Sequence, residues 1–441
     1  MRWKTAEYTG WGRVLKATGD MARPERVSAL KSLWADSKGP AIGNRRSYGD
    51  VCLNDKGRAI DMTRLNRMVA FDPLTGILEA EAGITLGEIT QVFATKGWIP
   101  HVVPGTGFVT LGGAIANDVH GKNHHGAGSF GQYVNRINLL GANGKTRIVT
   151  PCDTPDLFKA TIGGLGQTGV ILSAEIQLKP CASAIMDVRE NRAEGLDEFL
   201  AMLDRSTATY CVGWIDATAK GSTLGRGILE EAEIRDHTVQ AKLSRAKSVP
   251  RDAPSFAMSA PLVRLFNALY YRRVPQDGRR LDRPMQDFFF PLDRIHNVNR
   301  LYGKNGFHQF QCVLPDATAR EGLAEMLRAI SKAGLASPLA VIKKMGPGRA
   351  GFMSFPMQGY TLAVDFQNRP RAAGLIADLE EITLKSGGRI YLAKDALTRA
   401  DSIAEMYDEL PDFTRVVNAA DPKGVFLTDM VRRLKLRKIK P

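Results

Sequence analysis

The stretch VPGTGFVTLGGAIANDVHGKNHHGAGSFG, residues 103–131, sets a glycine every few positions beside three of the chain's seven histidines. A metal site would use the histidines, since His120 and His124 have the i, i+4 spacing that puts two imidazoles on one helix face. A cofactor site would use the glycines, because a backbone without Cβ lets N–H groups approach a flat ring or a diphosphate. Gly121 and Gly126 disfavour a helix here, and no HExxH carboxylate follows. The segment therefore favours a cofactor site, with a metal site or a purely structural turn as alternatives.

The length and composition indicate a two-domain globular protein. A chain of 441 residues exceeds the roughly 250–300 residues at which single cores stop growing. Its composition, 44% hydrophobic and 24% charged, is typical of a folded and water-soluble chain. No run approaches the ~18 apolar residues of a membrane span, and the start, MRWKTAEYTGWGR, lacks the apolar core of a signal peptide. We expect a cytoplasmic protein.

The charge of the chain points to an anionic partner. A net charge of +14 attracts nucleic acid, anionic lipid headgroups or a phosphorylated substrate. The basic end VRRLKLRKIKP, residues 431–441, is interpreted equally well as a solvated tail or as a membrane-surface contact. No nucleic-acid-binding motif surrounds the basic residues, so we expect no nucleic-acid partner. The five cysteines have no CxxC spacing and indicate neither a zinc ribbon nor a disulfide framework.

Local patterns predict the elements of the first half of the chain. They are a helix at 24–36, a short strand that runs into a turn within 39–50, two strands joined by the turn 72–76, a helix at 85–97 capped by Thr85, and a hairpin around Asn143-Gly144. Gly164, Gly166 and Gly169 satisfy GxGxxG, but a dinucleotide-binding turn must lead from a strand into a helix. Here the glycines lead into VILSAEIQL, which alternates as a strand, so we reject a Rossmann fold.

The second half is less regular at first. Residues 219–287 have weak periodicity and are interpreted as loops or a cover over a site. Within them LFNALYY, residues 265–271, precedes two arginines, and we favour a helix packed on its own domain over a lipid contact. HQFQCVLP at 308–315 and YTLAVDF at 360–366 predict strands, and GLIADLEEITLKSG at 374–387 predicts a helix.

Three glycine-bearing segments together resemble the flavin-binding half of the vanillyl-alcohol oxidase type of FAD enzyme: GNRRSYGD at 43–50, PGTGFVTLGGAIANDVHG at 104–121 and GGLGQTGV at 163–170. Further segments resemble the decaprenylphosphoryl-β-D-ribose 2-oxidase family in the same order, namely WIDATAKGSTLGRG, FFFPLDRIHNVNRLYG, GGRIYLAKDALTRA and DPKGVFLTDMVRRL. The resemblance covers nearly the whole chain and is weakest at 219–287.

The resemblance implies an α+β fold of two domains. Residues 1–184 would form the FAD-binding domain, residues 185–388 an antiparallel-sheet substrate domain, and residues 389–441 a return segment that completes the FAD-binding domain and the active site. The implied reaction oxidises the 2-hydroxyl of a polyprenyl-phosphate-linked ribose to a ketone. A separate NAD(P)H-dependent short-chain reductase would then complete the epimerisation to arabinose. Peripheral contact with an anionic membrane would agree with the basic charge.

The resemblance also implies which residues hold FAD. The first loop would wrap the diphosphate, the second would line the ring and ribityl chain, and the strand around Val170 would hold the adenine end. The implied cofactor residues are Ala41, Ile42, Gly43, Asn44, Arg45, Arg46, Ser47, Tyr48, Gly49, Asp50, Val51, Gly105, Thr110, Leu111, Gly112, Gly113, Asn117, Asp118, Val119, His120, Val170 and Tyr391. Covalent members of the superfamily commonly carry a histidine where this chain has Asp50, so we predict non-covalent FAD.

Lys394 is the foremost catalytic candidate that the resemblance implies. Its cation would favour a developing alkoxide, and it could act as a base only if burial lowered its pKa. A surface salt bridge with Asp395 is the alternative. The implied site also includes His120, Tyr48, Gln311 and Lys343.

Two glutamines and two histidines also have predicted roles. Gln309 and Gln311, two residues apart on a predicted strand, would share one face and could hold sugar hydroxyls. We expect His124 and His125 to hydrogen-bond within their own loop. The alternative functions are a soluble alditol or aldonolactone oxidase of the same superfamily and a non-catalytic flavoprotein.

Overall fold

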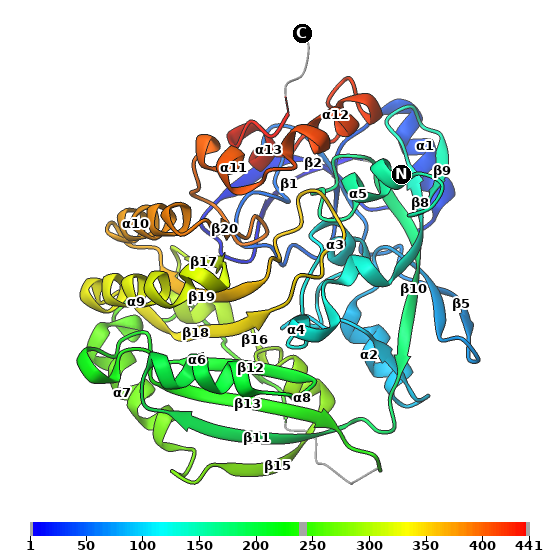
Figure 1. Ribbon diagram of the computed structural model, residues 1–441. Coiled ribbons are helices and arrows are strands. Elements are labelled where there is room, and N and C mark those ends of the chain that lie inside the picture. Colours follow the sequence, from blue (N-terminus) through cyan, green and yellow to red (C-terminus); the bar gives the residue numbers. More distant parts are fainter. Residues whose placement is uncertain (1–2, 238–244, 438–441) are drawn as a thin grey trace.

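The computed structural model describes residues 3–237 and 245–437 and consists of antiparallel and mixed sheets flanked by helices (Figure 1). The predicted α+β class is confirmed. Three sheets carry the architecture, and a fourth consists of the short parallel pair β14 (Lys247–Ser248) and β16 (Ile295–His296). None of the helices in the described ranges combines the length and apolar composition of a membrane span.

The N-terminal sheet carries the loop that follows β3. Its strands lie in the order β1 (Lys4–Thr9), β2 (Lys16–Ala22), β4 (Arg58–Asp61) and β3 (Ala41–Ile42). The two pairs that involve β4 are parallel. Helix α1 (Val27–Asp36) buries Leu30, Leu33 and Trp34. This helix begins three residues later than the sequence predicted.

The second sheet is built around its longest strand, β10 (Val170–Pro180). Its other strands are β5 (Met68–Asp72), β6 (Ile77–Glu81), β7 (Trp98–Pro100), β8 (Val134–Leu140) and β9 (Thr146–Val149). Strand β10 pairs with β6 on one side and β8 on the other, both antiparallel. The GxGxxG glycines therefore lead into a strand, as the sequence predicted.

Short helices connect the strands of the second sheet: α2 (Leu86–Ala94), α3 (Leu111–Ala116), α4 (His124–Ala127), η1 (Phe130–Tyr133) and α5 (Pro155–Thr161). The predicted cap of α2 is confirmed as a capping box, in which Thr85 and Glu88 exchange side-chain and backbone hydrogen bonds. Helix α3 was missed, because its two glycines favoured a loop. Its buried Leu111 and Ile115 and the capping side chain of Thr110 outweigh that preference.

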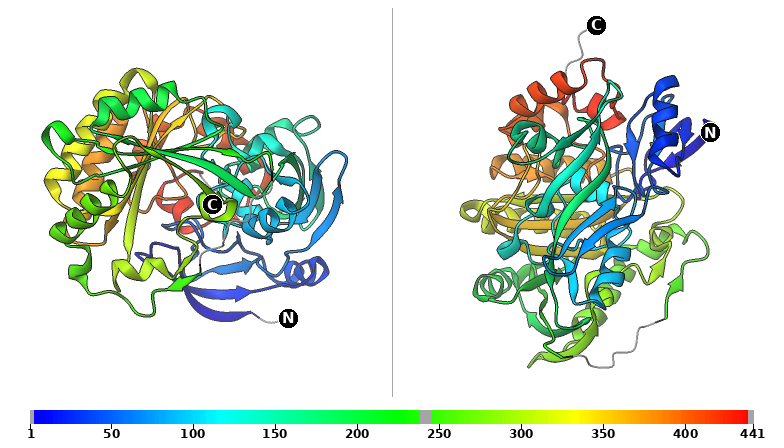
Figure 2. Two further views of the ribbon diagram at one scale, coloured as in Figure 1. Left: turned by 90° about the horizontal axis from the view of Figure 1, so that it is seen from below. Right: turned by 90° about the vertical axis from the view of Figure 1, so that its right-hand side faces the viewer.

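The third sheet has eight antiparallel strands in the order β15-β11-β13-β12-β18-β19-β17-β20. Their bounds are β15 (Arg279–Pro284), β11 (Ile185–Ala193), β13 (Gly227–Ile234), β12 (Tyr210–Ile215), β18 (Ala336–Met345), β19 (Gly359–Gln367), β17 (Phe307–Leu314) and β20 (Arg389–Ile390). Helices α6 (Leu196–Arg205), α9 (Asp316–Ala333) and α10 (Ala372–Lys385) cover its outer face (Figure 2).

The interpretation of residues 219–287 as loops is wrong for much of that range. It contains η2 (Gly221–Thr223), β13 in the interior of the sheet, η3 (Ser255–Met258), α7 (Ala260–Arg272), β15 and the start of α8 (Met285–Phe289); residues 238–244 lie outside the described part. The acidic run in β13 obscured the strand pattern. Glu230 of that run forms ion pairs with Arg273 and Arg283, which offsets the cost of placing a carboxylate there.

The C-terminal segment returns to the N-terminal sheet. Strand β20 joins the edge of the large sheet, α11 (Ala400–Met406) contacts α10, and α12 (Leu410–Ala420) contacts α5. Helix α13 (Asp429–Arg433) lies beside the segment that follows β3, where the Asp429 N–H donates to the Leu53 carbonyl at 2.9 Å. The guanidinium of Arg433 bonds to both carboxylate oxygens of Asp50 at 2.8 Å and to Asp395 at 2.8 Å. The last four residues of the basic end lie outside the described residues. The change of sheet falls between β10 and β11, and the division into three segments stays a prediction.

Candidate active site

A large cavity lies between the eight-stranded sheet and the first two sheets. It has a volume of about 1280 Å³, above the ~300–1,000 Å³ that ordinary ligand pockets occupy. Such a volume holds a dinucleotide cofactor together with a substrate. Residues from 11 to 394 line it, so segments from both halves of the chain contribute to one site.

Most of the sequence-predicted residues line this cavity. From the cofactor set these are Ala41, Ile42, Gly43, Asn44, Arg45, Arg46, Ser47, Tyr48, Val51, Gly105, Thr110, Gly112, Gly113, Asn117, Val119, His120 and Tyr391. From the catalytic set Lys394, Gln311 and Lys343 line it as well. The structure therefore brings together side chains that lie up to 353 positions apart in the chain, from Ala41 to Lys394.

Five predicted cofactor residues do not line the cavity. Leu111 and Val170 are fully buried in apolar clusters of the first two sheets. The backbone of Gly49 packs on Asp395, where an added Cβ would lie 1.7 Å from the carbonyl oxygen. Asp50 is turned toward Arg433. For Val170 the neighbours Gly169 and Ile171 line the cavity instead.

Asp118, the fifth, is a structural carboxylate. It is fully buried and accepts hydrogen bonds from the Ser129 hydroxyl at 2.7 Å, the Gly131 N–H at 2.8 Å and the Ser354 hydroxyl. Its φ of +39° is one that L-residues rarely adopt. These bonds tie the loop of Asp118 to the segment around Ser354, and the carboxylate does not line the cavity.

Bare backbone and unsatisfied polar atoms make the cavity fit a flat, polar cofactor. A Cβ added at Gly105 or Gly166 meets no atom of the described residues within 4 Å, so any side chain there would fill cavity space. Among described residues, Arg46 Nε, Asn117 Oδ1 and His120 Nδ1 are buried without a hydrogen-bond partner. Because buried polar atoms are normally satisfied, these three atoms indicate a ligand with complementary groups.

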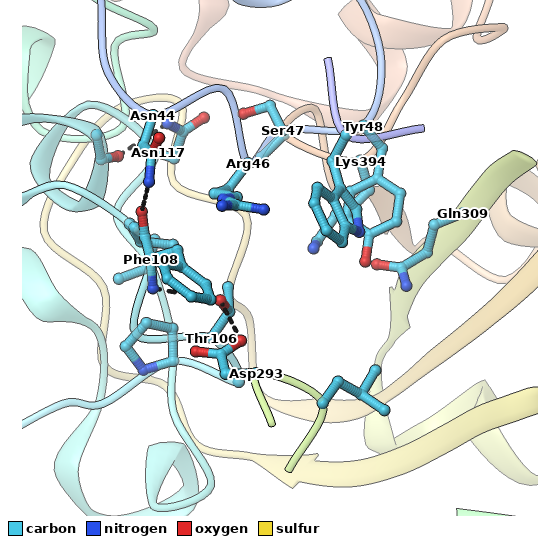
Figure 3. Close-up of a pocket in the computed structure, with 18 of the residues that line it drawn as sticks. Asn44, Arg46, Ser47, Tyr48, Thr106, Phe108, Asn117, Asp293, Gln309 and Lys394 are labelled. Atoms are coloured by element: carbon cyan, nitrogen blue, oxygen red, sulfur yellow. Dashed lines mark hydrogen bonds between the residues drawn. The ribbon is translucent and has the colours of Figure 1, made fainter. Parts of the chain in front are cut away.

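The first loop, residues 43–50, is held by aromatic partners that sequence reasoning missed. The guanidinium of Arg46 lies 4.5 Å from the ring centroids of both Trp11 and Phe108 (Figure 3). Asn44 Nδ2 donates to the Phe108 carbonyl at 3.0 Å. Burial lowers the pKa of Arg46. These ring contacts hold the Arg46 cation at the cavity wall, and Asp293 lies close enough to act on its charge.

Asp293 holds the second glycine-bearing segment, residues 104–121, in place. Its two oxygens accept from the Thr106 hydroxyl and the Gly107 N–H, each at 2.7 Å. It comes from FFFPLDRIHNVNRLYG, one of the segments that carried the resemblance, but nothing in the sequence pairs it with residue 106.

Lys394 lies against Tyr48 inside the cavity. Its Nζ is 4.0 Å from the centroid of the Tyr48 ring, and the Tyr48 N–H donates to the Ala393 carbonyl at 3.0 Å. Burial lowers the pKa of Lys394 to about 8, and burial raises the pKa of Tyr48 well above 10.0. The salt-bridge alternative is wrong, because Asp395 pairs with Arg433 and the Lys394 side chain lines the cavity beside Tyr48.

Polar side chains line the sheet face beside Lys394. Gln309 and Gln311 both reach the cavity, so the predicted shared face is confirmed. Gln309 Nε2 donates to Asp365 at 2.6 Å, and Tyr302 donates to the other oxygen of Asp365 at 2.7 Å. Burial raises the pKa of Asp365 to about 6. The amide of Gln309 is thereby fixed close to Tyr48 (Figure 3).

His120 completes this wall as a neutral imidazole. Burial, reinforced by Lys343, lowers the pKa of His120 well below 6.5. Its Nε2 lies 3.1 Å from Gln311 Nε2, which makes the histidine nitrogen the acceptor and leaves the proton on Nδ1.

Three lysines share the cavity. Burial lowers the pKa of Lys122 and Lys394 to about 8, and burial together with repulsion from these two lowers the pKa of Lys343 to about 7. Lys122 donates to the Phe288 carbonyl at 2.5 Å. Sequence reasoning missed Lys122 although it lies two residues after His120, within the glycine- and histidine-rich stretch 103–131. The cavity is cationic at this end.

The remaining histidines bind neighbouring segments. His124 Nδ1 accepts from the Gly346 N–H at 3.2 Å, and His125 Nε2 lies 2.9 Å from the Ala208 carbonyl. The prediction that His124 and His125 hydrogen-bond within their own loop is wrong, because their partners lie in other segments. In the ranges 3–237 and 245–437 no group of three His, Cys, Asp or Glu side chains is arranged to hold a metal ion.

Known proteins share this chain's pattern along its whole length. The FAD binding domain family model matches residues 24–150, and the D-arabinono-1,4-lactone oxidase model matches residues 364–434. The decaprenylphosphoryl-beta-D-ribose oxidase of Mycolicibacterium smegmatis is 35% identical over 98% of both chains. This chain belongs to the decaprenylphosphoryl-ribose oxidase family. It is an FAD-dependent oxidoreductase that acts on a CH–OH group.

Two further relatives place the chain within the superfamily. An uncharacterized protein of Streptomyces coelicolor is 33% identical over 80% of this chain and 100% of its own length. The L-gulono-1,4-lactone dehydrogenase of Mycobacterium tuberculosis is 22% identical over 97% of this chain and 98% of its own. The sugar-lactone enzymes are thus more distant relatives than the decaprenylphosphoryl-ribose oxidase.

Proposed function

We propose that this enzyme oxidises the 2-hydroxyl of a polyprenyl-phosphate-linked ribose to a ketone, the first half of an epimerisation to arabinose. The observation that carries the proposal is the end-to-end similarity to the mycobacterial decaprenylphosphoryl-beta-D-ribose oxidase.

The lining of the cavity supports a substrate with three parts. Gln309 and Gln311 offer amides to sugar hydroxyls, and the lysines that line the cavity offer positive charge to a phosphate. Apolar and aromatic side chains that also line the cavity suit a prenyl chain; they include Val212, Trp214, Tyr270, Leu339 and Val341. A free alditol or lactone would use only the first of these parts.

The residues that would hold FAD lie in three backbone segments, 41–48, 105–113 and 166–171. When bound there, FAD supplies an acceptor for the hydride that leaves the carbinol carbon. The protein must then accept the proton of the substrate hydroxyl or stabilise the alkoxide that its loss leaves. Lys394, with a pKa lowered to about 8, takes up the hydroxyl proton when neutral and stabilises an alkoxide when charged. Neutral His120 keeps Gln311 oriented through its Nε2.

The product defines the partner. A 2-keto sugar must be reduced at the opposite face to give arabinose, and we propose that a separate NAD(P)H-dependent short-chain reductase does this. We also propose a cytoplasmic enzyme that contacts the membrane peripherally, since its substrate would be a lipid.

Anaerobic reduction of the bound flavin tests the substrate. We expect the visible flavin band to bleach with a polyprenyl-phospho-ribose and to persist with xylitol and gulonolactone. The reverse pattern would favour the second candidate, a soluble alditol or aldonolactone oxidase, which is suggested by the lactone-oxidase match at residues 364–434. Bleaching with none of the three would contradict both.

A further inference from the structure

Helix α7 turns an apolar stripe toward solvent. Leu262, Leu265, Phe266 and Leu269 follow the i, i+3, i+4, i+7 spacing that normally faces a core, yet their exposed fractions are 43%, 58%, 48% and 60%. Phe256, in η3 just before the helix, is 66% exposed. We call these five residues the apolar stripe. The sequence favoured a helix packed on its own domain through this pattern, and the structure places the pattern outward.

The rotation of α7 is fixed from its inner side. Val263 and Asn267 are buried, and Asn267 Nδ2 donates to Asp216 Oδ1 at 2.8 Å. Asp216 is itself buried and paired with Arg226 at 2.7 Å. Turning the stripe inward would break this buried amide–carboxylate bond, so the outward orientation is a stable feature of the fold.

The stripe is continuous with the cavity. The ring of Phe266 stacks on Tyr270 with centroids 5.8 Å apart, and Tyr270 lies 4.7 Å from Trp214. Both Tyr270 and Trp214 line the cavity, as does Arg273 just after the helix. An unbroken row of aromatic side chains therefore runs from an exposed surface to the substrate end of the site.

The segment that carries the stripe is basic. The segment 253–276 contains Arg264, Arg272 and Arg273 and no aspartate or glutamate. Arg264 and Arg272 are exposed. An exposed apolar helix face flanked by arginines is the composition of helices that lie in the headgroup region of an anionic bilayer.

We propose that the apolar stripe docks the enzyme on an anionic lipid surface, with α7 lying in the headgroup region and the cavity opening beside it. The docking does not depend on the nature of the substrate. Entry of a lipid-linked sugar from the bilayer along Phe266, Tyr270 and Trp214 rests on the proposed function.

Vesicle binding by the FAD-loaded protein tests the docking. We expect it to sediment with vesicles of phosphatidylcholine and phosphatidylglycerol, less so with phosphatidylcholine alone, and less at high salt. Leu265→Glu with Leu269→Glu should lower the partition more than tenfold. The matched control is Val69→Glu with Ile148→Glu, because both side chains are 56% exposed and lie on β5 and β9, away from α7 (Figure 1). An unbound wild type, or equal loss in both double variants, would overturn the proposal.

Two measurements distinguish lipid docking from dimerisation and from entry of the substrate. A wild type that light scattering finds dimeric, with the stripe variant monomeric and no vesicle binding by either, would assign the stripe to a second copy and overturn the proposal. A short-chain polyprenyl-phospho-ribose in solution should bleach the flavin of the stripe variant, Leu265→Glu with Leu269→Glu, as fast as the flavin of the wild type. A long-chain substrate in vesicles should bleach the flavin of this variant more than tenfold slower than that of the wild type. If neither substrate bleaches the wild type while vesicles still bind, the proposed function fails and the docking stands.

Discussion

Replacing Lys343 by methionine should stabilise the protein, and only below a defined pH. Lys343 lies on β18 with its side chain in the cavity, where burial and the charges of Lys122 and Lys394 lower its pKa to about 7. Methionine has a similar length and no charge. The substitution removes an amine that the folded state holds in a site unfavourable to its charged form.

The structure sets the size and the sign of the effect. The difference between 10.5 and about 7 corresponds to about 5 kcal/mol, at ~1.4 kcal/mol for each tenfold change in proton affinity. Water in the cavity screens part of this cost, and we expect a measured gain of about 1–2 kcal/mol. The unfolded chain binds the proton more tightly, so the full cost applies below pH 7 and fades as the pH rises toward 10.5. The gain should therefore be largest at low pH.

Urea unfolding of the FAD-loaded proteins at pH 6, 8 and 10 measures the difference directly. Lys344→Met is the matched control, because the neighbouring lysine alternates to the other face of β18 and pairs with Asp204. It should lose about 0.5 kcal/mol at most, with no trend over this pH range. A Lys343→Met protein that is less stable than wild type at pH 6, or whose gain does not shrink by pH 10, would refute the reasoning.

Four further outcomes follow from the site. Acid or detergent should release the yellow colour, since Asp50 stands where covalent members carry histidine; colour that stays with the precipitated protein would contradict this. Lys394→Ala should keep FAD bound but slow flavin reduction by about 100-fold or more, and normal reduction would remove it from the catalytic residues. Gly105→Val should lose FAD on gel filtration while its far-UV circular dichroism is unchanged, because the new side chain enters only the cavity; retained FAD would count against the cradle. Arg433→Met should lower the free energy of unfolding by about 3–5 kcal/mol, because it leaves Asp50 and Asp395 without their ion pairs. A loss below about 1 kcal/mol would show that these two ion pairs contribute little to stability.

Local chemistry made part of the fold predictable. The capping box of α2 and the strand character of β10 depend on residues within a few positions of each other, and both were predicted correctly. Helix α3 was missed because tertiary burial of Leu111 and Ile115 outweighs its glycines. Strand β13 was missed because its acidic run hid the strand pattern, and the arginines that pair with Glu230 lie 43 and 53 positions away.

The site shows the same division. The glycine-bearing loops were found because bare backbone leaves a mark in the sequence. The clamp of Trp11 and Phe108 on Arg46 and the bond of Asp293 to Thr106 left none, since each joins segments whose proximity only the fold creates. The histidines near Lys122 drew attention to its segment, but a lysine beside histidines is also common on protein surfaces. Only the fold shows that Lys122 lines the cavity.

The position of Lys394 is set by a sheet edge. Strand β20 pairs with β17, and the next N–H, that of Tyr391, donates to the Gln311 carbonyl at 2.9 Å. The Lys394 N–H then donates to the Tyr391 carbonyl at 2.9 Å, which closes a tight turn directly beside Gln311. Backbone hydrogen bonds thus fix the amine against the amide wall, while the Tyr48 N–H holds the first loop to the same turn through Ala393. Because one backbone turn positions both Lys394 and the first loop, we expect a movement of that turn to displace the lysine and the loop together.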